Sequence, residues 1–256
     1  MTTTYAVSDG VATITLASPE TRNVLNAESM GGLLAHLRAA NDDSDVRVIV
    51  LTGSGSTFCA GADLAGAAAA DDDSFAATGP RAMVAVLEAM LDHPKPIVAR
   101  VQGHVAGGGN GLVAAADLAV AVESARFAFS EVRVGVAPAV ISVVCLARMS
   151  PPHARELLLT GERVSAQRAL EAGLLTAVVD DAALDATVAA YVDALRLGGP
   201  QALAATKALL RRVPGMSRDD AFAWTADLSA SLFSSEEARD GMTAFLERRR
   251  PSWAPV

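Results

Sequence analysis

A mixed α/β fold is predicted by three patterns along the chain: short apolar runs typical of strands, helical segments between them, and small-residue stretches that follow some of the strands. With 256 residues, the chain can bury a sizeable core as one large domain or two modest ones. Hydrophobic residues make up 51% of the sequence and aromatic residues only 4%, so we expect a core of Ala, Val and Leu.

The N-terminal half supplies most of the expected strands. Thr4–Val7 and Val11–Leu16 flank Ser8-Asp9-Gly10, and Asp-Gly between two such runs indicates a hairpin. Apolar residues recur at helical spacing in residues 27–40, and Asn26 is suited to cap this helix. The elements expected next are a strand at Val46–Leu51, a helix at Arg81–Leu91, a strand at Pro96–Val101, a short helix at Gly109–Ala116 and a strand at Asp117–Val122.

After about residue 140 helices dominate, apart from a strand at Leu175–Val179. Thr160-Gly161 and Gly198-Gly199-Pro200 indicate breaks between them. The expected helices are Val140–Arg148, Pro152–Leu159, Ala166–Ala172, Ala183–Leu197, Ala202–Arg211, Asp219–Phe233 and Ser235–Arg249. We therefore divide the chain into a core, residues 1–195, and a helical region, residues 196–256.

Composition argues against several classes of partner. The 21 basic and 29 acidic side chains give a net charge of −8, which opposes binding to nucleic acid or to anionic membranes. Cys59 and Cys145 have no paired spacing and belong to no Cys/His cluster, which favours a reducing compartment without structural zinc. The N-terminus lacks the features of a signal peptide, and no uncharged apolar run reaches about 18 residues. We expect a cytoplasmic protein without a membrane span.

Two stretches rich in glycine and alanine carry the functional interpretation: Phe58–Leu64 (FCAGADL) and Val101–Leu112 (VQGHVAGGGNGL). Their small residues allow backbone N–H groups to approach a substrate oxygen, and two converging N–H groups would form an oxyanion hole. Each stretch alone could equally serve tight turns and close helix packing. A lone carboxylate, Glu131, follows the second stretch.

Four further segments extend this pattern over nearly the whole chain: Asn23–Asn26 (NVLN), Gly103–Asp117 (GHVAGGGNGLVAAAD), Phe127–Gly135 (FAFSEVRVG) and Gly241–Arg250 (GMTAFLERRR). Together the segments resemble the crotonase (enoyl-CoA hydratase/isomerase) superfamily. The resemblance implies a spiral of ββα units as an acyl-CoA-binding core, and a C-terminal helical region that forms homotrimers, often paired into hexamers. It also implies an acyl-CoA thioester substrate with no separate cofactor, since coenzyme A enters as part of the substrate.

The same resemblance assigns the catalytic roles. Ala62 and Gly108 would donate the two backbone N–H groups, and Glu131 would exchange protons. Hydratases with two carboxylates carry the other glutamate two residues after the triple glycine, but this chain has Gly111 there. Glu131 must then act alone or with a hydroxyl that positions water, for which the candidates are Ser130 and Ser142.

The surroundings of Glu131 allow two interpretations. Apolar neighbours, namely Phe127, Phe129, Val132 and Val134, would raise its pKa and favour proton transfer. Alternatively, Glu131 is a surface residue paired with Arg126 or Arg133. Three other residues are expected to be structural: His104 beside the glycines, Asp63 as a side chain that fixes its loop, and Cys59 as a buried hydrophobe.

Coenzyme A needs cations and backbone acceptors for its phosphates and adenine. The candidate cations are Arg22 and Arg248–Arg250. A solvated charged tail is an equal explanation for Arg248–Arg250. By resemblance, Phe245 and Arg248 would reach the nucleotide bound to a neighbouring subunit. The candidate substrate and coenzyme A contacts are Arg22, Asn23, Val24, Ala60, Ala62, Asp63, Leu64, Gly108, Phe245 and Arg248. Residues 65–79 are expected to form a solvated, flexible loop at the edge of the acyl pocket.

These inferences favour a hydratase that adds water to a 2-enoyl-CoA. The alternatives are a 3-enoyl-CoA to 2-enoyl-CoA isomerase, which needs only one base, and a hydratase of branched, methylglutaconyl-type substrates. A catalytically silent coenzyme A-binding protein and an RNA-binding protein are further alternatives; the net charge argues against RNA.

Overall fold

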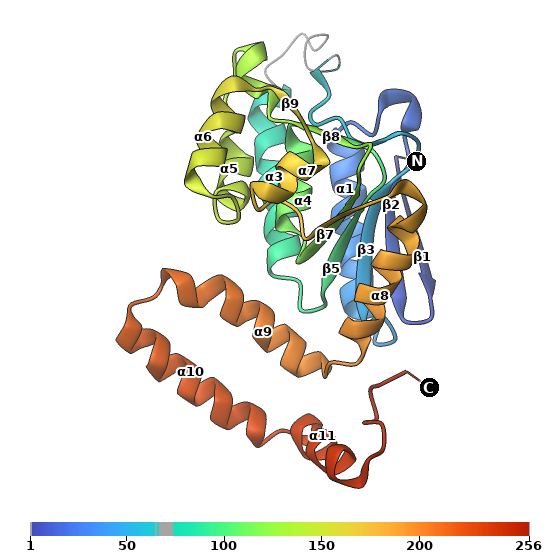
Figure 1. The fold of residues 1–256 in the computed structure, drawn as a ribbon, viewed down its shortest axis with the longest axis vertical. Coiled ribbons are helices and arrows are strands. Elements are labelled where there is room, and N and C mark those ends of the chain that lie inside the picture. Colours follow the sequence, from blue (N-terminus) through green and yellow to red (C-terminus); the bar gives the residue numbers. More distant parts are fainter. Residues whose placement is uncertain (1, 65, 67–73, 256) are drawn as a thin grey trace.

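The computed structural model describes residues 2–64, 66 and 74–255 (Figure 1). An α/β body carries the helices that precede Pro200, and a helical arm projects from it, formed by α9 (Pro200–Arg212), α10 (Arg218–Phe233) and α11 (Glu236–Glu247). The predicted mixed α/β class is confirmed. The body contains a six-stranded sheet in the order β1-β2-β3-β5-β7-β10 and a four-stranded sheet in the order β4-β6-β8-β9.

The N-terminal hairpin forms as predicted. β1 (Thr3–Ser8) and β2 (Val11–Leu16) pair antiparallel, with Ser8 opposite Val11. Asp9 and Gly10 make the two-residue turn with φ of 49° and 74°. Left-handed conformations at both central positions match the right-handed twist of the strands, and Asp-Gly tolerates them.

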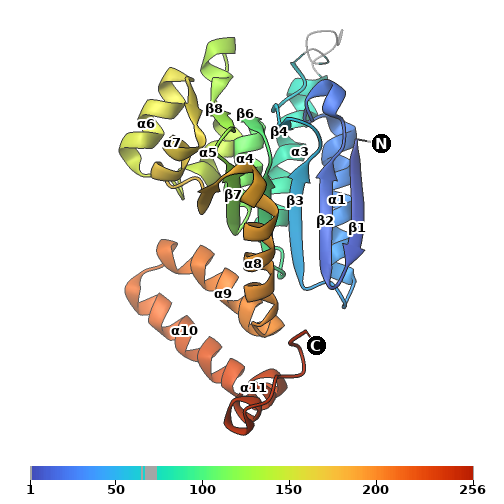
Figure 2. The ribbon, with the colours of Figure 1, turned by 45° about the vertical axis from the view of Figure 1, so that its right-hand side comes forward.

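The rest of the large sheet is parallel. β2 pairs with β3 (Val48–Gly53), β3 with β5 (Ile97–Val101), β5 with β7 (Leu118–Val122), and β7 with β10 (Ala177–Val179). All six residues of β3 are buried because helices cover both faces of the sheet. α1 (Ala27–Asp42) and α3 (Ser74–Leu91) lie on one side and α8 (Leu184–Arg196) on the other (Figures 1 and 2).

The small sheet consists of three-residue strands that the sequence did not identify: β4 (Thr57–Cys59), β6 (His104–Ala106), β8 (Arg126–Ala128) and β9 (Arg163–Ser165). β4, β6 and β8 follow β3, β5 and β7 along the chain. Two consecutive strands and a helix therefore recur, as expected for a ββα spiral. Three residues are too few to show a period-2 pattern, so these strands exist through pairing with neighbours.

The helices agree with the expected ones to within a few residues, except for α3. Asn26 caps α1 as predicted, because its side chain accepts from Ser29 N–H and Ser29 Oγ accepts from Asn26 N–H. α3 begins at Ser74 rather than at Arg81, so the expected loop at 65–79 is wrong for its last six residues. Residues 65 and 67–73 of that expected loop lie outside the described residues.

The remaining helices complete the body. They are α4 (Gly108–Ala115), α5 (Ala139–Cys145), α6 (Pro151–Thr160) and α7 (Ala166–Glu171), with short 3-10 turns η1 (Pro19–Thr21), η2 (Ser130–Val134) and η3 (Asp181–Ala183). A further 3-10 turn, η4 (Val213–Gly215), lies in the arm between α9 and α10. α4 contributes most directly to the core, since every residue from Gly109 to Ala115 is buried.

The arm has little core of its own. α9 and α10 contain no buried residue, and α11 contains one, Ala244. Leu210, Phe222, Phe233 and Phe245 are 68–83% exposed. α8 ends at Arg196, next to the expected boundary at 195/196, while the role of the arm in trimerisation stays a prediction. Within the described ranges, no helix has both the length and the apolar character required to cross a membrane.

Candidate active site

The first glycine-alanine stretch meets the start of α1 in a single parallel bridge. Leu25 N–H donates to the carbonyl of Gly61 (2.7 Å), and Asp63 N–H donates to the carbonyl of Leu25 (3.2 Å). These two bonds use the residues on either side of Ala62, so the N–H of Ala62 points away from Leu25. Ala62 is exposed, so we expect its N–H to be accessible to a ligand.

The second expected donor lies at the start of α4. Gly108 is the first residue of this helix, and N–H groups in a first turn have no partner within their own helix. The turn before it is held by Asn110, whose Nδ2 donates to the carbonyl of Ala128 (2.8 Å) and whose N–H donates to that of Gly107 (2.9 Å). The buried Asn110 thus fixes the turn from which the Gly108 N–H projects.

Gly61 brings the two stretches together. Its φ is +84°, and a Cβ added to it would lie 3.2 Å from Gly108 N and 2.9 Å from the carbonyl oxygen of Ala106. Any larger residue would push the two backbones apart. No sequence pattern singles out Gly61 or Asn110, because a positive φ and a buried amide contact depend on the tertiary fold.

Glu131 lies directly against this turn. A Cβ added to Gly107 would lie 3.6 Å from Glu131 Oε1. Oε2 is buried and, among the described residues, has no hydrogen-bond partner. Burial raises the pKa of this carboxyl group above its usual value, and a hydrogen bond with its own backbone opposes the rise. The structure thus brings Glu131 next to Gly107, and Gly61 next to Gly107 and Gly108, so the three expected site residues lie in neighbouring loops; their catalytic roles stay a prediction.

The causes of this burial differ partly from expectation. Phe127 and Phe129 are buried, but Val132 and Val134 are 37% and 54% exposed and point largely to solvent. The alternative of a surface ion pair is wrong. Arg126 donates to the carbonyls of residues 123–125, and Arg133 donates to that of Thr160 and approaches Glu162 at 3.9 Å.

Three residues have the structural roles expected of them. His104 Nδ1 accepts from Arg126 N–H (3.2 Å) in the small sheet. Asp63 Oδ1 accepts from Gly66 N–H (2.9 Å), which fixes the loop after Ala62. Cys59 is fully buried, and burial raises the pKa of its thiol to about 12, so it is not a nucleophile.

Gly111 faces packed apolar side chains. A Cβ added there would lie 2.6 Å from Ile141 Cγ2 and 3.2 Å from Met83 Cε. The site where two-carboxylate hydratases carry a second glutamate is thus filled by apolar groups. Of the hydroxyls considered as helpers, Ser142 donates to the carbonyl of Ala139 (2.7 Å), and its oxygen retains the capacity to accept.

The first group of expected coenzyme A contacts surrounds the same loops. Ala60 N–H donates to the carbonyl of Arg22 (3.0 Å), and Leu64 is 54% exposed. Asn23 is buried, and its side chain accepts from Ser18 N–H and donates to carbonyls of the β3–β4 segment. With its polar atoms so occupied, Asn23 shapes the loop rather than offering a side chain to a ligand. Val24, partly buried, lies between it and Leu25.

Phe245 and Arg248 are not brought to the site within one chain. Both belong to the end of α11, at the far end of the arm from β6, β8 and α4 (Figure 2). Phe245 is 83% exposed. Arg249, the middle residue of the expected charged tail, pairs with Asp240 (2.7 Å) and Glu247 (2.8 Å).

Comparison with known proteins agrees with this geometry. The sequence model of the family described as enoyl-CoA hydratase/isomerase matches residues 6–255. The chain belongs to this family. It is 34% identical to (E)-benzylidenesuccinyl-CoA hydratase of Thauera aromatica, over 99% of each chain, and 34% identical to an enoyl-CoA hydratase of Mycobacterium tuberculosis, over 94% of this chain and 91% of the relative. The solved structure of an enoyl-CoA hydratase of Mycobacterium smegmatis superposes with a TM-score of 0.93, at 34% identity and 99% coverage of both chains.

The crotonase-superfamily resemblance and the fold that it implies are therefore confirmed.

The buried carboxyl group predicts a pH-dependent stability difference. With a raised pKa in the fold, Glu131 lowers stability as pH rises from about 4.3, the unfolded pKa of Glu, through the folded pKa. Glu131→Gln should therefore melt at a higher temperature than the wild type at pH 7, and the gain should vanish towards pH 4. Melting curves across this range check it, with the exposed Glu162→Gln as control. A gain independent of pH would contradict burial as its cause.

Proposed function

We propose that this family member is an enoyl-CoA hydratase that uses a single carboxylate. The observation that carries the proposal is the buried, unpartnered Oε2 of Glu131 beside two loops with open backbone N–H groups. A thioester resists addition until negative charge on its carbonyl oxygen is stabilised, which Ala62 and Gly108 N–H would do. The hydratases named above, each 34% identical to the chain, support this reaction class.

One proton-transferring group is sufficient for the addition of water to the double bond. Glu131 accepts a proton from water as the water oxygen bonds to C3, and the C2–C3 π electrons move onto C2 and the thioester oxygen as an enolate. Glu131 then gives the proton to C2, and the enolate reverts to the thioester. Its raised pKa supports both halves of this cycle, because a group with pKa nearer neutrality both accepts and donates readily.

A 3-enoyl-CoA to 2-enoyl-CoA isomerase is the second candidate, and the packing at Gly111 favours it. Ile141 and Met83 fill the place of a second carboxylate, so no second group activates water there. In this reaction Glu131 removes a proton from C2, the double bond shifts, and the proton returns at C4. The same oxyanion hole stabilises the same enolate.

Assembly completes the proposed site. We place Phe245 and Arg248 at the nucleotide of a neighbouring subunit in a homotrimer or a dimer of trimers. The 83% exposure of Phe245 and the exposed apolar side chains of α9 and α10 support this, since such groups are usually buried at interfaces.

Turnover of crotonyl-CoA, followed by loss of its conjugated thioester absorbance, tests the proposal. We expect Glu131→Gln to bind coenzyme A thioesters as the wild type does and to lose activity by about 100-fold or more, the usual effect of removing positioned proton transfer. A folded variant with wild-type turnover would exclude Glu131. If the wild type raises the conjugated thioester absorbance of a 3-enoyl-CoA solution but does not hydrate crotonyl-CoA, the enzyme is an isomerase instead.

The backbone donor has its own matched pair of variants. Proline is well tolerated at the first position of a helix, so Gly108→Pro removes the N–H with little damage to α4. We expect it to lower kcat by about 100-fold. Gly108→Ala keeps the N–H and adds a methyl group against the movable Leu25 Cδ1, so it should retain most activity. Equal losses in the two variants would remove Gly108 from the oxyanion hole.

The presence of Gly111 where two-carboxylate hydratases carry a glutamate gives a prediction of its own. Gly111→Glu alone should fold poorly, because its Cβ would lie 2.6 Å from Ile141 Cγ2; for the same reason Gly111→Ala is not a neutral control. In Gly111→Glu/Ile141→Ala the space is freed, and we expect faster hydration of crotonyl-CoA than in Ile141→Ala. Steady-state rates and melting temperatures of the three variants check this. An equal rate in the double variant would show that water activation does not limit the reaction.

A further inference from the structure

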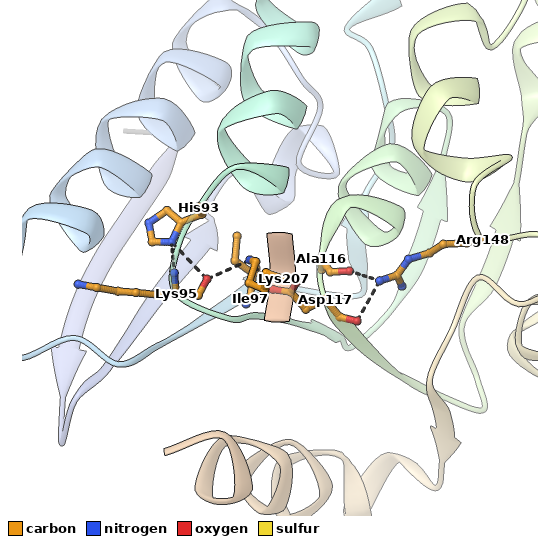
Figure 3. Close-up of polar contacts among 7 residues, drawn as sticks. All are labelled: His93, Lys95, Ile97, Ala116, Asp117, Arg148 and Lys207. Carbon is orange, nitrogen blue, oxygen red and sulfur yellow. Dashed lines mark hydrogen bonds and ion pairs between the residues drawn. The ribbon is translucent and has the colours of Figure 1, made fainter. Parts of the chain in front are cut away.

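Polar contacts clamp the C-terminal end of α4, the helix that begins with Gly108 (Figure 3). Arg148, which follows α5, donates through one nitrogen to the carbonyls of Ala116 and Asp117. Burial lowers the pKa of Arg148, and the negative charge of Asp117 opposes this shift. The last carbonyls of a helix lack partners within it and carry partial negative charge, so a cation is favoured there.

Lys207 adds a second cation from a distant part of the chain, α9 in the arm. Its Nζ lies 2.6 Å from Asp117 Oδ2 and donates to the carbonyl of Lys95 (3.1 Å), and its side chain is only 10% exposed. Asp117 Oδ2 also accepts from Ile97 N–H at the start of β5 (2.7 Å). Asp117 thus joins the end of α4 to β5 and α9.

Apolar packing does little to fix α9 against the body. α9 has no buried residue, and a cavity of about 150 Å³ lies at its start, lined in part by Val46, Pro96, Pro200 and Leu203. Arg47 of the body donates to the carbonyl of Gly198, just before α9. Among the described residues, α9 makes one other ion pair with the body, between Arg211 and Asp92, whose side chains are 43% and 60% exposed, and exposed pairs contribute little. The Lys207–Asp117 pair is the less exposed of the two and therefore the stronger fixed contact of α9 itself with the body.

We propose that Lys207 is a positioning residue for the oxyanion hole, acting through Asp117 and α4. This rests on the proposed role of Gly108 as a donor. α4 has eight residues and is about 12 Å long, so it transmits a displacement of one end to the other. Its buried sides keep it in the core, while contacts at its ends set its axial position. A shift of about 1 Å far from the reacting atoms can cost about 100-fold in rate.

Lys95 offers a matched control. Its Nζ donates to the carbonyls of Ala40 (2.5 Å), Asn41 (3.2 Å) and Asp43 (2.6 Å), so it too caps the end of a helix, α1. The Lys95 side chain does not contact α4 in the described residues. Lys95→Met and Lys207→Met therefore remove the same charged group from the ends of two different helices. Only α4, whose end Lys207 reaches through Asp117, begins with Gly108.

The carbonyl stretch of bound butyryl-CoA, labelled with ¹³C at the thioester, measures the oxyanion hole directly in difference infrared spectra. This substrate has no double bond, so it binds without hydration or isomerisation. We expect the wild type to lower the stretch frequency, Lys207→Met to lose most of this shift, Lys207→Arg to restore it, and Lys95→Met to retain it. With a turned-over enoyl-CoA, Lys207→Met should lower kcat about tenfold or more and leave KM within about twofold.

A wild-type carbonyl shift in folded Lys207→Met would overturn the positioning role while leaving the proposed function intact. The absence of a shift in the wild type would overturn the proposed function and this proposal with it. Should Lys207→Met fail to fold, Asp117→Asn serves instead: it keeps an acceptor for Ile97 N–H, removes the charge that pairs with Lys207, and is expected to lose the shift in the same way.

Discussion

The site depends on the direct contact between two backbones, Gly61 on one loop and Gly107–Gly108 on the other. A Cβ at Gly61 would lie 3.2 Å from Gly108 N, closer than packed side chains normally approach. Without side chains between them, the loops present Ala62 and Gly108 to a common space. The Leu25–Ala62 bridge and the Asn110 amide hold the two loops in this position, so the two proposed donors would be in place before a substrate arrives.

The partly desolvated carboxyl group of Glu131 is expected to lower the stability of the fold. Its Oε2 is buried with no partner in the described part of the chain, although a buried polar atom usually finds one. A structural carboxylate would be satisfied by an arginine, and the two nearest in sequence, Arg126 and Arg133, are occupied elsewhere. An unsatisfied, partly desolvated carboxyl group is useful when a substrate proton or a water becomes its partner.

The arm and the end of α4 are linked by the contact of Lys207 with Asp117. If Phe245 and Arg248 serve a neighbouring subunit, the arm whose position Lys207 fixes is also the part that assembles the oligomer. One buried ion pair would then bear on both the binding of coenzyme A and the geometry of catalysis. Such a pair favours a defined arrangement more than it adds stability, because desolvation offsets much of its attraction.

The sequence by itself determined the elements whose signals are local. Asp9-Gly10 predicts the hairpin turn, Asn26 predicts the start of α1, and the glycine-rich stretches with Glu131 predict the three groups that the fold brings together. Turn and cap preferences arise within a few residues, so neighbouring residues suffice to recognise them.

Only the tertiary structure decided what depends on distant partners. The strands β4, β6, β8 and β9 are three residues long and exist through pairing across the spiral. Ile141 and Met83, which pack over Gly111, each lie about 30 residues away along the chain. The Asn23 side chain donates to the carbonyls of Ser54 and Thr57, 31 and 34 residues away. No local pattern in the sequence predicts either contact. Burial, left-handed glycine geometry and buried ion pairs are properties of the assembled core, because each requires groups that the chain brings together only on folding.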